Sequence, residues 1–301
     1  MYNTKGDNEH MKARKKIILI AMSLMLILSA VGCSNKQTTE FNADKEITVI
    51  ARDAASGTRG AFHELMKIKV KEKETETDNL AVGALEFDGT DKVITAVEKD
   101  KYAVGYISIG SLSDRVKPAS INGFFPTEEN VKNGDYVVSR PYLLLTNGIE
   151  NDLVKDFLSF TESVQGQEIV RKMHYIGAVE SPKLYEASNI SGTIKVAGST
   201  SVAPLMEKIQ EAYKDLNPNV TFEMQANGSS QGIKAAIEGT YDIGMSSRNL
   251  KDDEKSQLNE HTLAIDGIAV IINKINPKTD LSSENITKIY TGEITKWSEV
   301  K

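Results

Sequence analysis

Three segments of this chain place glycine beside serine or threonine where a strand-like pattern gives way to a helix-like one. They are AASGTRGAF (54–62), AGSTSVAPLM (197–206) and NGSSQGIKAAI (227–237). The first N–H groups of a helix have no partner inside the helix, and the helix dipole is positive at that end. Glycine lets a ligand approach the backbone and each hydroxyl adds a donor, so such a junction can hold an anion. Helix capping alone would explain one junction, but three in one chain indicate a shared oxyanion site.

The rest of the chain alternates between strand-like and helix-like segments, which predicts an α/β architecture with mainly parallel sheets. The charged run KIKVKEKETETD (67–78) is predicted as a solvated helix end or loop, and the apolar strand at 263–273 is long enough to cross between two lobes. The predicted strands are residues 45–52, 81–87, 102–109, 142–146, 193–197, 220–225, 243–245 and 263–273, and the predicted helices are residues 60–69, 90–99, 151–173, 202–216, 231–238 and 286–290.

The N-terminus has the pattern of a secretory signal peptide. A basic segment at 11–16, with Lys12, Arg14, Lys15 and Lys16, precedes an apolar run at 17–28 and small residues at 29–32, which is the order that such a signal requires. We therefore predict residues 1–32 as a signal peptide whose true start is Met11. Cys33 follows directly and resembles the lipidated cysteine of a bacterial lipoprotein, the alternative being a plain signal with an incidental cysteine. Residues 33–44 are predicted as the lipid attachment and a flexible tether, which would hold the body on the extracytoplasmic face of the cell membrane.

Charge and motif content argue against several classes of protein. A net charge of −6 without a basic stripe disfavours nucleic-acid binding. His63, His174 and His261 have neither metal-ligand spacing nor a nucleophile pattern around them, so we predict no metal, no cofactor and no enzymatic activity. None of the three junctions has the pattern of a P-loop or of a dinucleotide site. A small tetrahedral oxyanion therefore fits them better than a nucleotide.

Six segments together resemble the PstS-type phosphate-binding proteins, the extracytoplasmic receptors of phosphate ABC transporters. The resemblance extends from about Lys45 to Glu299 and is carried by ITVIARDAASGTRGAF, GSTSVAPLMEKI, QANGSSQGIKAAIEG, DIGMSSR, AIDGIAVIIN and IYTGEITKWSEV. It implies a two-lobed, Venus-flytrap α/β fold of the periplasmic-binding-protein type that closes on phosphate at the hinge. It also implies a monomer that delivers phosphate to the permease and ATPase subunits of a transporter. A non-transport surface protein or sensor, and another oxyanion such as sulfate, are the alternatives.

The segments stand in a different order from that of the family. There the AGSTS segment comes first and the SGTRG segment follows WSEV, whereas here WSEV closes the chain. The resemblance therefore implies a circular permutation, with the old termini joined through residues 181–191 and the new ends in the loop after Val300. A piece of a tandem, or a misassembled reading frame, is the alternative. By the family pattern, residues 45–135 plus 267–301 form one lobe, and residues 136–180 plus 192–266 form the other.

The resemblance also assigns phosphate ligands to both lobes. Some family members have an aspartate where this chain has Ser247, and that aspartate accepts the proton of hydrogen phosphate. Asp266, near a lobe crossing, is our candidate for the same role, the alternative being a structural carboxylate at a strand end. The predicted phosphate-binding residues are Arg52, Ser56, Gly57, Thr58, Thr200, Ser201, Ser229, Ser247 and Asp266.

Overall fold

The computed structural model describes residues 40–72 and 75–301. The predicted signal peptide and the predicted lipid attachment at Cys33 lie outside these residues. In the described part of the chain, every helix is too short or too polar to cross a bilayer.

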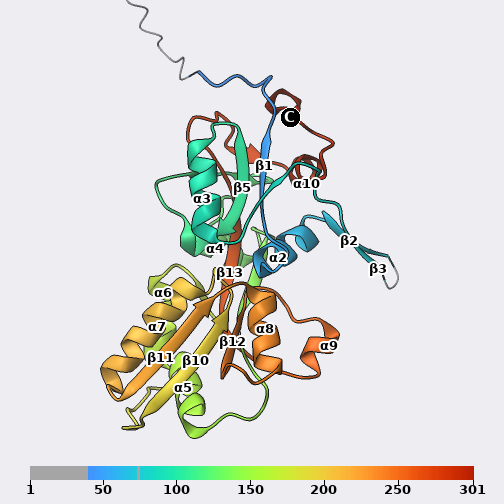
Figure 1. Cartoon of the computed structure of the whole chain (residues 1–301). Helices are drawn as coiled ribbons and strands as arrows, with labels where there is room; N and C mark the ends of the chain where they lie inside the picture. The colour runs from blue at the N-terminus through green and yellow to red at the C-terminus, as the bar shows by residue number, and fades with distance from the viewer. Residues whose placement is uncertain (1–39, 73–74) are drawn as a thin grey trace, which may run out of the picture. The chain divides into compact units, whose positions relative to one another are not determined.

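One lobe is built on a parallel sheet near the start of the described chain (Figure 1). Strand β1 (Thr48–Arg52) pairs in parallel with β4 (Leu85–Phe87) on one side and with β5 (Ala103–Ser108) on the other. Helices α2 (Gly57–Leu65), α3 (Thr90–Lys99) and α10 (Ser283–Thr291) contribute buried residues to its core. That core also takes in Tyr136 and Val138, so the lobe boundary on this stretch lies nearer residue 139 than residue 135.

The other lobe repeats the design with later residues. Strand β10 (Gly192–Gly198) pairs in parallel with β11 (Val220–Ala226) and β12 (Ile243–Ser246). A second hydrophobic core forms between this sheet and its helices. The helices of this core are α5 (Asp152–Glu162), α6 (Val164–Lys172) and α7 (Ala203–Leu216). Helix α8 (Ser229–Ile237) packs in a separate cluster, in which its Ile233 and Ala236 join Leu143 and Leu145.

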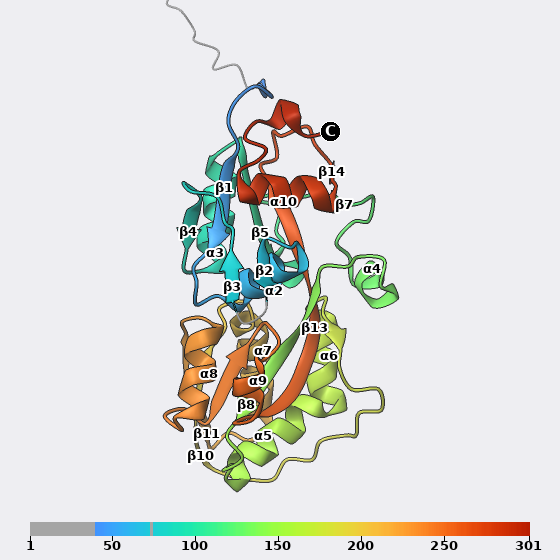
Figure 2. The same cartoon turned by 90° about the vertical axis from the view of Figure 1, so that its right-hand side faces the viewer.

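Two long strands pass from one lobe to the other. Strand β8 (Ser139–Thr146) lies antiparallel to β13 (Asn259–Ile272), and together they connect the two parallel sheets in the order β12-β8-β13-β5. Figure 2 shows β13 running through both lobes. The prediction that β13 crosses between lobes is confirmed. The prediction of mainly parallel sheets needs a correction, because the centre of the sheet is antiparallel.

The predicted helix at 151–173 is wrong in one respect, because it consists of two helices. Ser163 has extended backbone angles between α5 and α6, and its hydroxyl caps α6 by accepting the N–H of Gly166. A Cβ at Gly166 would lie 2.3 Å from the carbonyl oxygen of Phe160. Glycine therefore permits the sharp turn that a serine cap begins.

The charged run at 67–78 is also corrected. It forms an antiparallel hairpin of β2 (Lys69–Glu72) and β3 (Thr75–Asp78) instead of a helix end or loop. Opposite charges face each other across it, with the Lys69 ammonium 2.5 Å from the Glu76 carboxylate. Such cross-strand pairs stabilise a hairpin whose side chains are mostly in water.

The remaining elements are short. They are β6 (Lys117–Pro118), β7 (Ser120–Ile121), β9 (Ile176–Gly177), β14 (Asp280–Leu281), α4 (Glu128–Asn133), α9 (Asp252–Lys255) and the 3₁₀ turns η1 (Ile109–Ser111) and η2 (Trp297–Glu299).

The two ends of the described chain pair with each other. The N–H of Ile47 donates to the carbonyl of Thr295 over 2.7 Å, and the N–H of Ser298 donates to the carbonyl of Ala43 over 2.8 Å. Residues 178–191 connect β9 to β10 without helix or strand. Tyr185 anchors this connection, since its backbone exchanges two hydrogen bonds with the Gln165 side chain.

Candidate anion-binding site

The three glycine and hydroxyl junctions predicted from the sequence meet at one place between the lobes. Thr58, in the first turn of α2, lies with its hydroxyl 2.8 Å from that of Ser201, which precedes α7. A Cβ at Gly57 would lie 2.3 Å from the hydroxyl of Ser229, the first residue of α8. Glycine at position 57 is therefore what lets the two lobes come together here. The N-terminal ends of α2, α7 and α8 converge although their residues are far apart in the sequence.

The second lobe contributes a buried cluster of three serine hydroxyls. Ser199 donates to Ser247 over 2.9 Å, and the hydroxyls of Ser229 and Ser247 lie 3.3 Å apart. The backbone N–H of Ser247 also donates to the Ser229 hydroxyl over 3.1 Å. Hydroxyls can rotate to donate or accept, so a protein–protein bond here can be exchanged for a bond to a ligand. Ser229 and Ser247 were predicted for the site; Ser199 was not.

Arg52, at the end of β1, is buried, with only 2% of its surface exposed. Its Nη2 donates to the Thr200 hydroxyl over 2.9 Å, and its Nε donates to the carbonyl of Phe87 over 3.1 Å. Burial lowers the pKa of Arg52, but an arginine side chain keeps its charge in proteins.

The partners of the Arg52 guanidinium are all neutral. Among residues 40–72 and 75–301, no carboxylate oxygen lies within 4.0 Å of its nitrogens, whereas Arg59, Arg115, Arg140 and Arg248 each have such a partner. A buried charge is costly unless an opposite charge compensates it. The position is therefore suited to an anion that arrives from solution.

Thr90 belongs to the same arrangement and was missed by the sequence analysis. Its hydroxyl accepts a hydrogen bond from Nη1 of Arg52 over 3.4 Å and lies 3.4 Å from the hydroxyl of Ser201. Thr90 begins α3 directly after Gly89, so it is a fourth glycine-hydroxyl junction between a strand and a helix. The same pattern that identified the other three would have found it.

Asp266 lies at the hinge, in contact with residues other than the predicted donors. Its Oδ1 accepts from Ser108 over 2.8 Å, and its Oδ2 accepts from Nη2 of Arg140 over 2.9 Å. Arg140 in turn donates to the carbonyl of Ser247 over 3.2 Å. Burial raises the pKa of Asp266, and the charge of Arg140 opposes that rise. Asp266 is thus connected to the serine cluster through Arg140.

Asp53 is a second carboxylate near the site. It follows Arg52 in the chain, and its charge raises the pKa of Arg52 against the larger effect of burial. Its Oδ1 is buried and has no hydrogen-bond partner within the described ranges. A buried carboxylate oxygen without a donor is unusual, and a protonated ligand would supply one.

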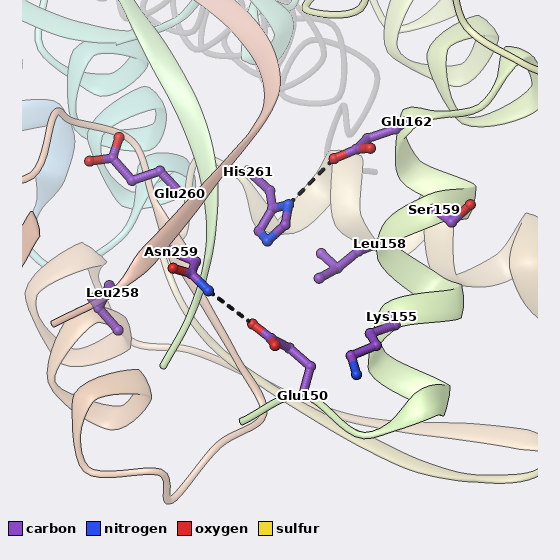
Figure 3. Close-up of a pocket in the computed structure, with 9 residues that line it drawn as sticks. All are labelled: Glu150, Lys155, Leu158, Ser159, Glu162, Leu258, Asn259, Glu260 and His261. Carbon is purple, nitrogen blue, oxygen red and sulfur yellow. Dashed lines mark hydrogen bonds and ion pairs between the residues drawn. The ribbon is translucent and has the colours of Figure 1, made fainter. Parts of the chain in front are cut away.

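A separate cavity of about 520 Å³ lies in the second lobe, between α5 and the start of β13 (Figure 3). His261 lies 3.4 Å from the Glu162 carboxylate, and Asn259 donates to Glu150 over 3.4 Å. With Glu260 the lining holds three carboxylates and one lysine. This balance of charge disfavours an anion, so the cavity is a poorer candidate than the junctions.

Comparison with known proteins identifies the family of this chain. The family model described as "PBP superfamily domain" matches residues 13–164 and 185–301. Phosphate-binding protein PstS 2 of Streptococcus agalactiae serotype V is 42% identical over 294 residues, which cover 96% of this chain and 99% of that protein. A solved structure of a phosphate-binding protein of a phosphate ABC transporter from Streptococcus pneumoniae TIGR4 is 40% identical, with a TM-score of 0.70, and the match covers 85% of this chain and 100% of that chain.

The chain belongs to the PBP superfamily and, within it, to the family of the PstS phosphate-binding proteins. Family membership confirms the resemblance and the two-lobed fold predicted from the sequence, and with them a binding protein instead of an enzyme. A further relative, phosphate-binding protein PstS of Staphylococcus haemolyticus, is 35% identical over only 120 residues, which cover 37% of this chain and 38% of that protein.

Proposed function

We propose that this protein captures inorganic phosphate between its two lobes and delivers it to the membrane subunits of an ABC transporter. The observation that carries the proposal is Arg52, a buried cation whose partners are all neutral and which lies among converging helix N-termini. The names of the relatives, which are phosphate-binding proteins, point to the same ligand.

The proposed ligands surround a tetrahedral anion with one full charge and many dipoles. Charge-assisted hydrogen bonds contribute about 1.5–3 kcal/mol each, while micromolar affinity corresponds to about −8 kcal/mol. A few such bonds therefore suffice, and the surplus is consumed by removing water from the anion and ordering the lobes. The proposed phosphate-binding residues are Arg52, Ser56, Gly57, Thr58, Thr90, Thr200, Ser201, Ser229, Ser247 and, as acceptor of the ligand's proton, Asp266.

Phosphate would favour the closed arrangement because its ligands come from both lobes. The pairs Thr58–Ser201 and Arg52–Thr200 already bridge the lobes over 2.8 Å and 2.9 Å. A ligand that contacts both sides binds the closed form more strongly than the open form and so shifts the population toward it. The closed form is the one that we propose the transporter recognises.

Selection of phosphate over sulfate needs a group that accepts the ligand's proton. We propose Asp266 for this role, as the sequence suggested, with Asp53 as the competing candidate. The contacts of Asp266 to Ser108 and Arg140 leave it less free than Asp53, whose Oδ1 is unpartnered among the described residues. A site built for a proton donor rejects an analogue that lacks the proton.

Calorimetric titration with phosphate and then sulfate tests the function and the selectivity together. The wild type should bind one phosphate and give no heat with sulfate. Asp266→Asn and Asp53→Asn identify the acceptor, because the variant that gains sulfate binding has lost it. Ser230→Ala is a control at the same helix mouth, because the Ser230 contact to Ala55 uses the backbone N–H and not the side chain. Wild-type protein that binds neither anion would contradict the proposal.

We further propose that the protein is held outside the cytoplasm by a lipid on Cys33 and that its segments are circularly permuted. The pairing of Ile47 with Thr295 and of Ala43 with Ser298 supports the permutation, since permuted ends must lie close together. The full-length match to the Streptococcus agalactiae relative argues against a misassembled reading frame. Mass spectrometry of the membrane fraction should find the lipid on Cys33 and no peptide from residues 1–32.

A further inference from the structure

The backbone of Arg52 is held on both sides by side chains that do not themselves line the proposed anion site. Its N–H donates to the hydroxyl of Tyr106 over 3.1 Å. Its carbonyl accepts from Nη1 of Arg59 over 3.0 Å. The guanidinium itself has weaker support, since two of its contacts, to Thr90 and to the carbonyl of Asp88, are 3.4 Å long. Its other two contacts, to Thr200 and to the Phe87 carbonyl, are 2.9 Å and 3.1 Å long. The position of the Arg52 charge therefore depends in part on its backbone.

A line of hydrogen bonds continues from Tyr106 to the hairpin. The Tyr106 hydroxyl lies 3.2 Å from Nε2 of His63, and Nδ1 of His63 lies 2.9 Å from Oδ1 of Asp78 on β3. His63 is fully buried, and burial lowers its pKa against the opposing effect of Asp78. A neutral imidazole with its proton on Nδ1 satisfies every group: Tyr106 donates to Nε2, and Nδ1–H donates to Asp78.

Asp78 also binds Arg59, the residue that donates to the carbonyl of Arg52. Its Oδ2 accepts from Nε of Arg59 over 3.0 Å, and Arg59 pairs with Glu86 over 2.5 Å as well. One carboxylate thus orients both the histidine that supports Tyr106 and the arginine that holds the Arg52 carbonyl. Asp78 comes from the hairpin, in the charged run that was predicted as a solvated helix end or loop.

We infer that Tyr106, His63 and Asp78 are positioning residues for phosphate binding, which act by holding the backbone of Arg52. This inference rests on the proposed function, because it takes Arg52 as the phosphate-binding cation. Without the Tyr106 hydroxyl, the buried N–H of Arg52 lacks an acceptor and His63 lacks a donor. The C-terminal end of β1 can then shift so that the Arg52 N–H and the His63 imidazole find other partners. This shift displaces the Arg52 guanidinium as well.

Tyr106→Phe tests the inference against a matched control, Tyr290→Phe. Tyr290 is equally buried, packs on the same Phe62 ring and donates to the carbonyl of Ile50 over 3.1 Å, two residues before Arg52 on the same strand. Both variants lose one buried hydroxyl from one aromatic cluster. We expect both to lower the melting temperature to a similar extent, while only Tyr106→Phe weakens phosphate binding, by about tenfold. Equal phosphate affinity in the two variants would overturn the inference.

Hydrogen exchange of the Arg52 amide supplies a readout that needs no phosphate. We expect Tyr106→Phe to speed this exchange and Tyr290→Phe to leave it near the wild-type rate. The result also separates the two proposals. Wild-type protein that binds no phosphate would contradict the proposed function, whereas an unchanged Arg52 exchange rate in Tyr106→Phe would contradict the positioning role.

If a core variant fails to fold, two less buried residues, Asp78 and Glu86, test the inference from the hairpin end of the hydrogen-bond series. Asp78→Ala and Glu86→Ala each remove one carboxylate from Arg59, but only Asp78 also holds His63. We expect Asp78→Ala to weaken phosphate binding more than Glu86→Ala does. Asp78→Asn should recover part of the affinity, because its amide oxygen still accepts the His63 proton. Equal losses in both alanine variants would remove His63 from the mechanism.

Discussion

Two buried arginines of this protein stand in opposite electrostatic situations. Arg52 and Arg140 are 2% and 3% exposed, and each lies on a strand at the junction of the lobes. Arg140 has its counter-charge within the chain, in Asp266 at 2.9 Å, while the guanidinium of Arg52 contacts only hydroxyl and carbonyl oxygens among the described residues. The charge of Arg140 is therefore compensated within the chain, whereas the charge of Arg52 would be compensated by the proposed anion.

From this difference we predict opposite changes in the free energy of unfolding when each charge is removed. Taking one partner from a buried ion pair leaves the other charge uncompensated, which costs about 3–5 kcal/mol. Removing a buried charge that has no counter-charge takes away a desolvation penalty instead. Methionine replaces the arginine stem in volume, so Arg52→Met and Arg140→Met form a matched pair.

The largest effect is expected on ligand binding. Arg52→Met should lose about 3–6 kcal/mol of phosphate affinity, the equivalent of two charge-assisted hydrogen bonds. Titration calorimetry measures this loss directly. Without phosphate, the variant should melt at or above the wild-type temperature, and added phosphate should no longer raise that temperature. An Arg52→Met protein that still binds phosphate tightly would remove Arg52 from the site.

Arg140→Met is expected to act on stability first. Asp266 would remain buried without its cation, and the free energy of unfolding should fall by about 3–5 kcal/mol. Urea denaturation measures this change. The double variant Arg140→Met with Asp266→Leu should recover much of it, because both charges are then gone. A double variant as unstable as the single one would show that the pair contributes through shape and not through charge.

Acid unfolding should depend on Asp78. Burial opposes its ionisation, but the hydrogen bond from His63 and the charge of Arg59 outweigh burial and lower its pKa from 3.8 to about 2. A lowered pKa in the folded state stabilises the fold fully above pH 3.8, and this contribution is lost as the pH falls toward 2. Allowing for solvent screening, we expect about 1 kcal/mol.

Asp78→Asn provides the comparison for this pH dependence. Its unfolding free energy, measured from pH 6 to pH 2, should decline less steeply than that of the wild type between about pH 4 and pH 2. Parallel curves for the two proteins would mean that Asp78 titrates normally in the folded state.

The smallest effect is expected from an exposed ion pair between the lobes. Glu76 on the hairpin lies 3.3 Å from Lys251, the residue before α9 in the other lobe. Glu76→Gln should weaken phosphate binding by about 0.2–1 kcal/mol, an effect that disappears at high salt. Glu211→Gln, which breaks the Lys208–Glu211 pair within one lobe, should leave the affinity unchanged. Equal affinities of these two variants at low salt would exclude a role for Glu76 in closure.

Local patterns predicted many of the elements because their causes are local. The α3 helix was predicted at 90–99 and is found at Thr90–Lys99, since an amphipathic repeat and a glycine junction determine it. The break at Ser163 was missed because the apolar repeat continues across it, while the turn depends on a cap and on space at Gly166. The hairpin was missed because alternating charges are equally compatible with a solvated loop.

The site shows the same division between local and long-range causes. The hydroxyl junctions of α2, α7 and α8 were found from the sequence, because a helix N-terminus has the same chemistry wherever it lies in the fold. The partners of the charged groups were not found. Asp266 faces Arg140 through the pairing of β13 with β8, and His63 reaches Asp78 through the fold of a hairpin.

The sequence by itself therefore predicted the candidate ligands of the site: an arginine, glycines that admit a ligand, and hydroxyls at helix ends. Only the tertiary structure decided which charges cancel within the chain and which remain for a ligand. The reason is physical: donors are properties of residues and their helix ends, whereas compensation of a buried charge depends on distances of a few ångströms between segments remote in sequence.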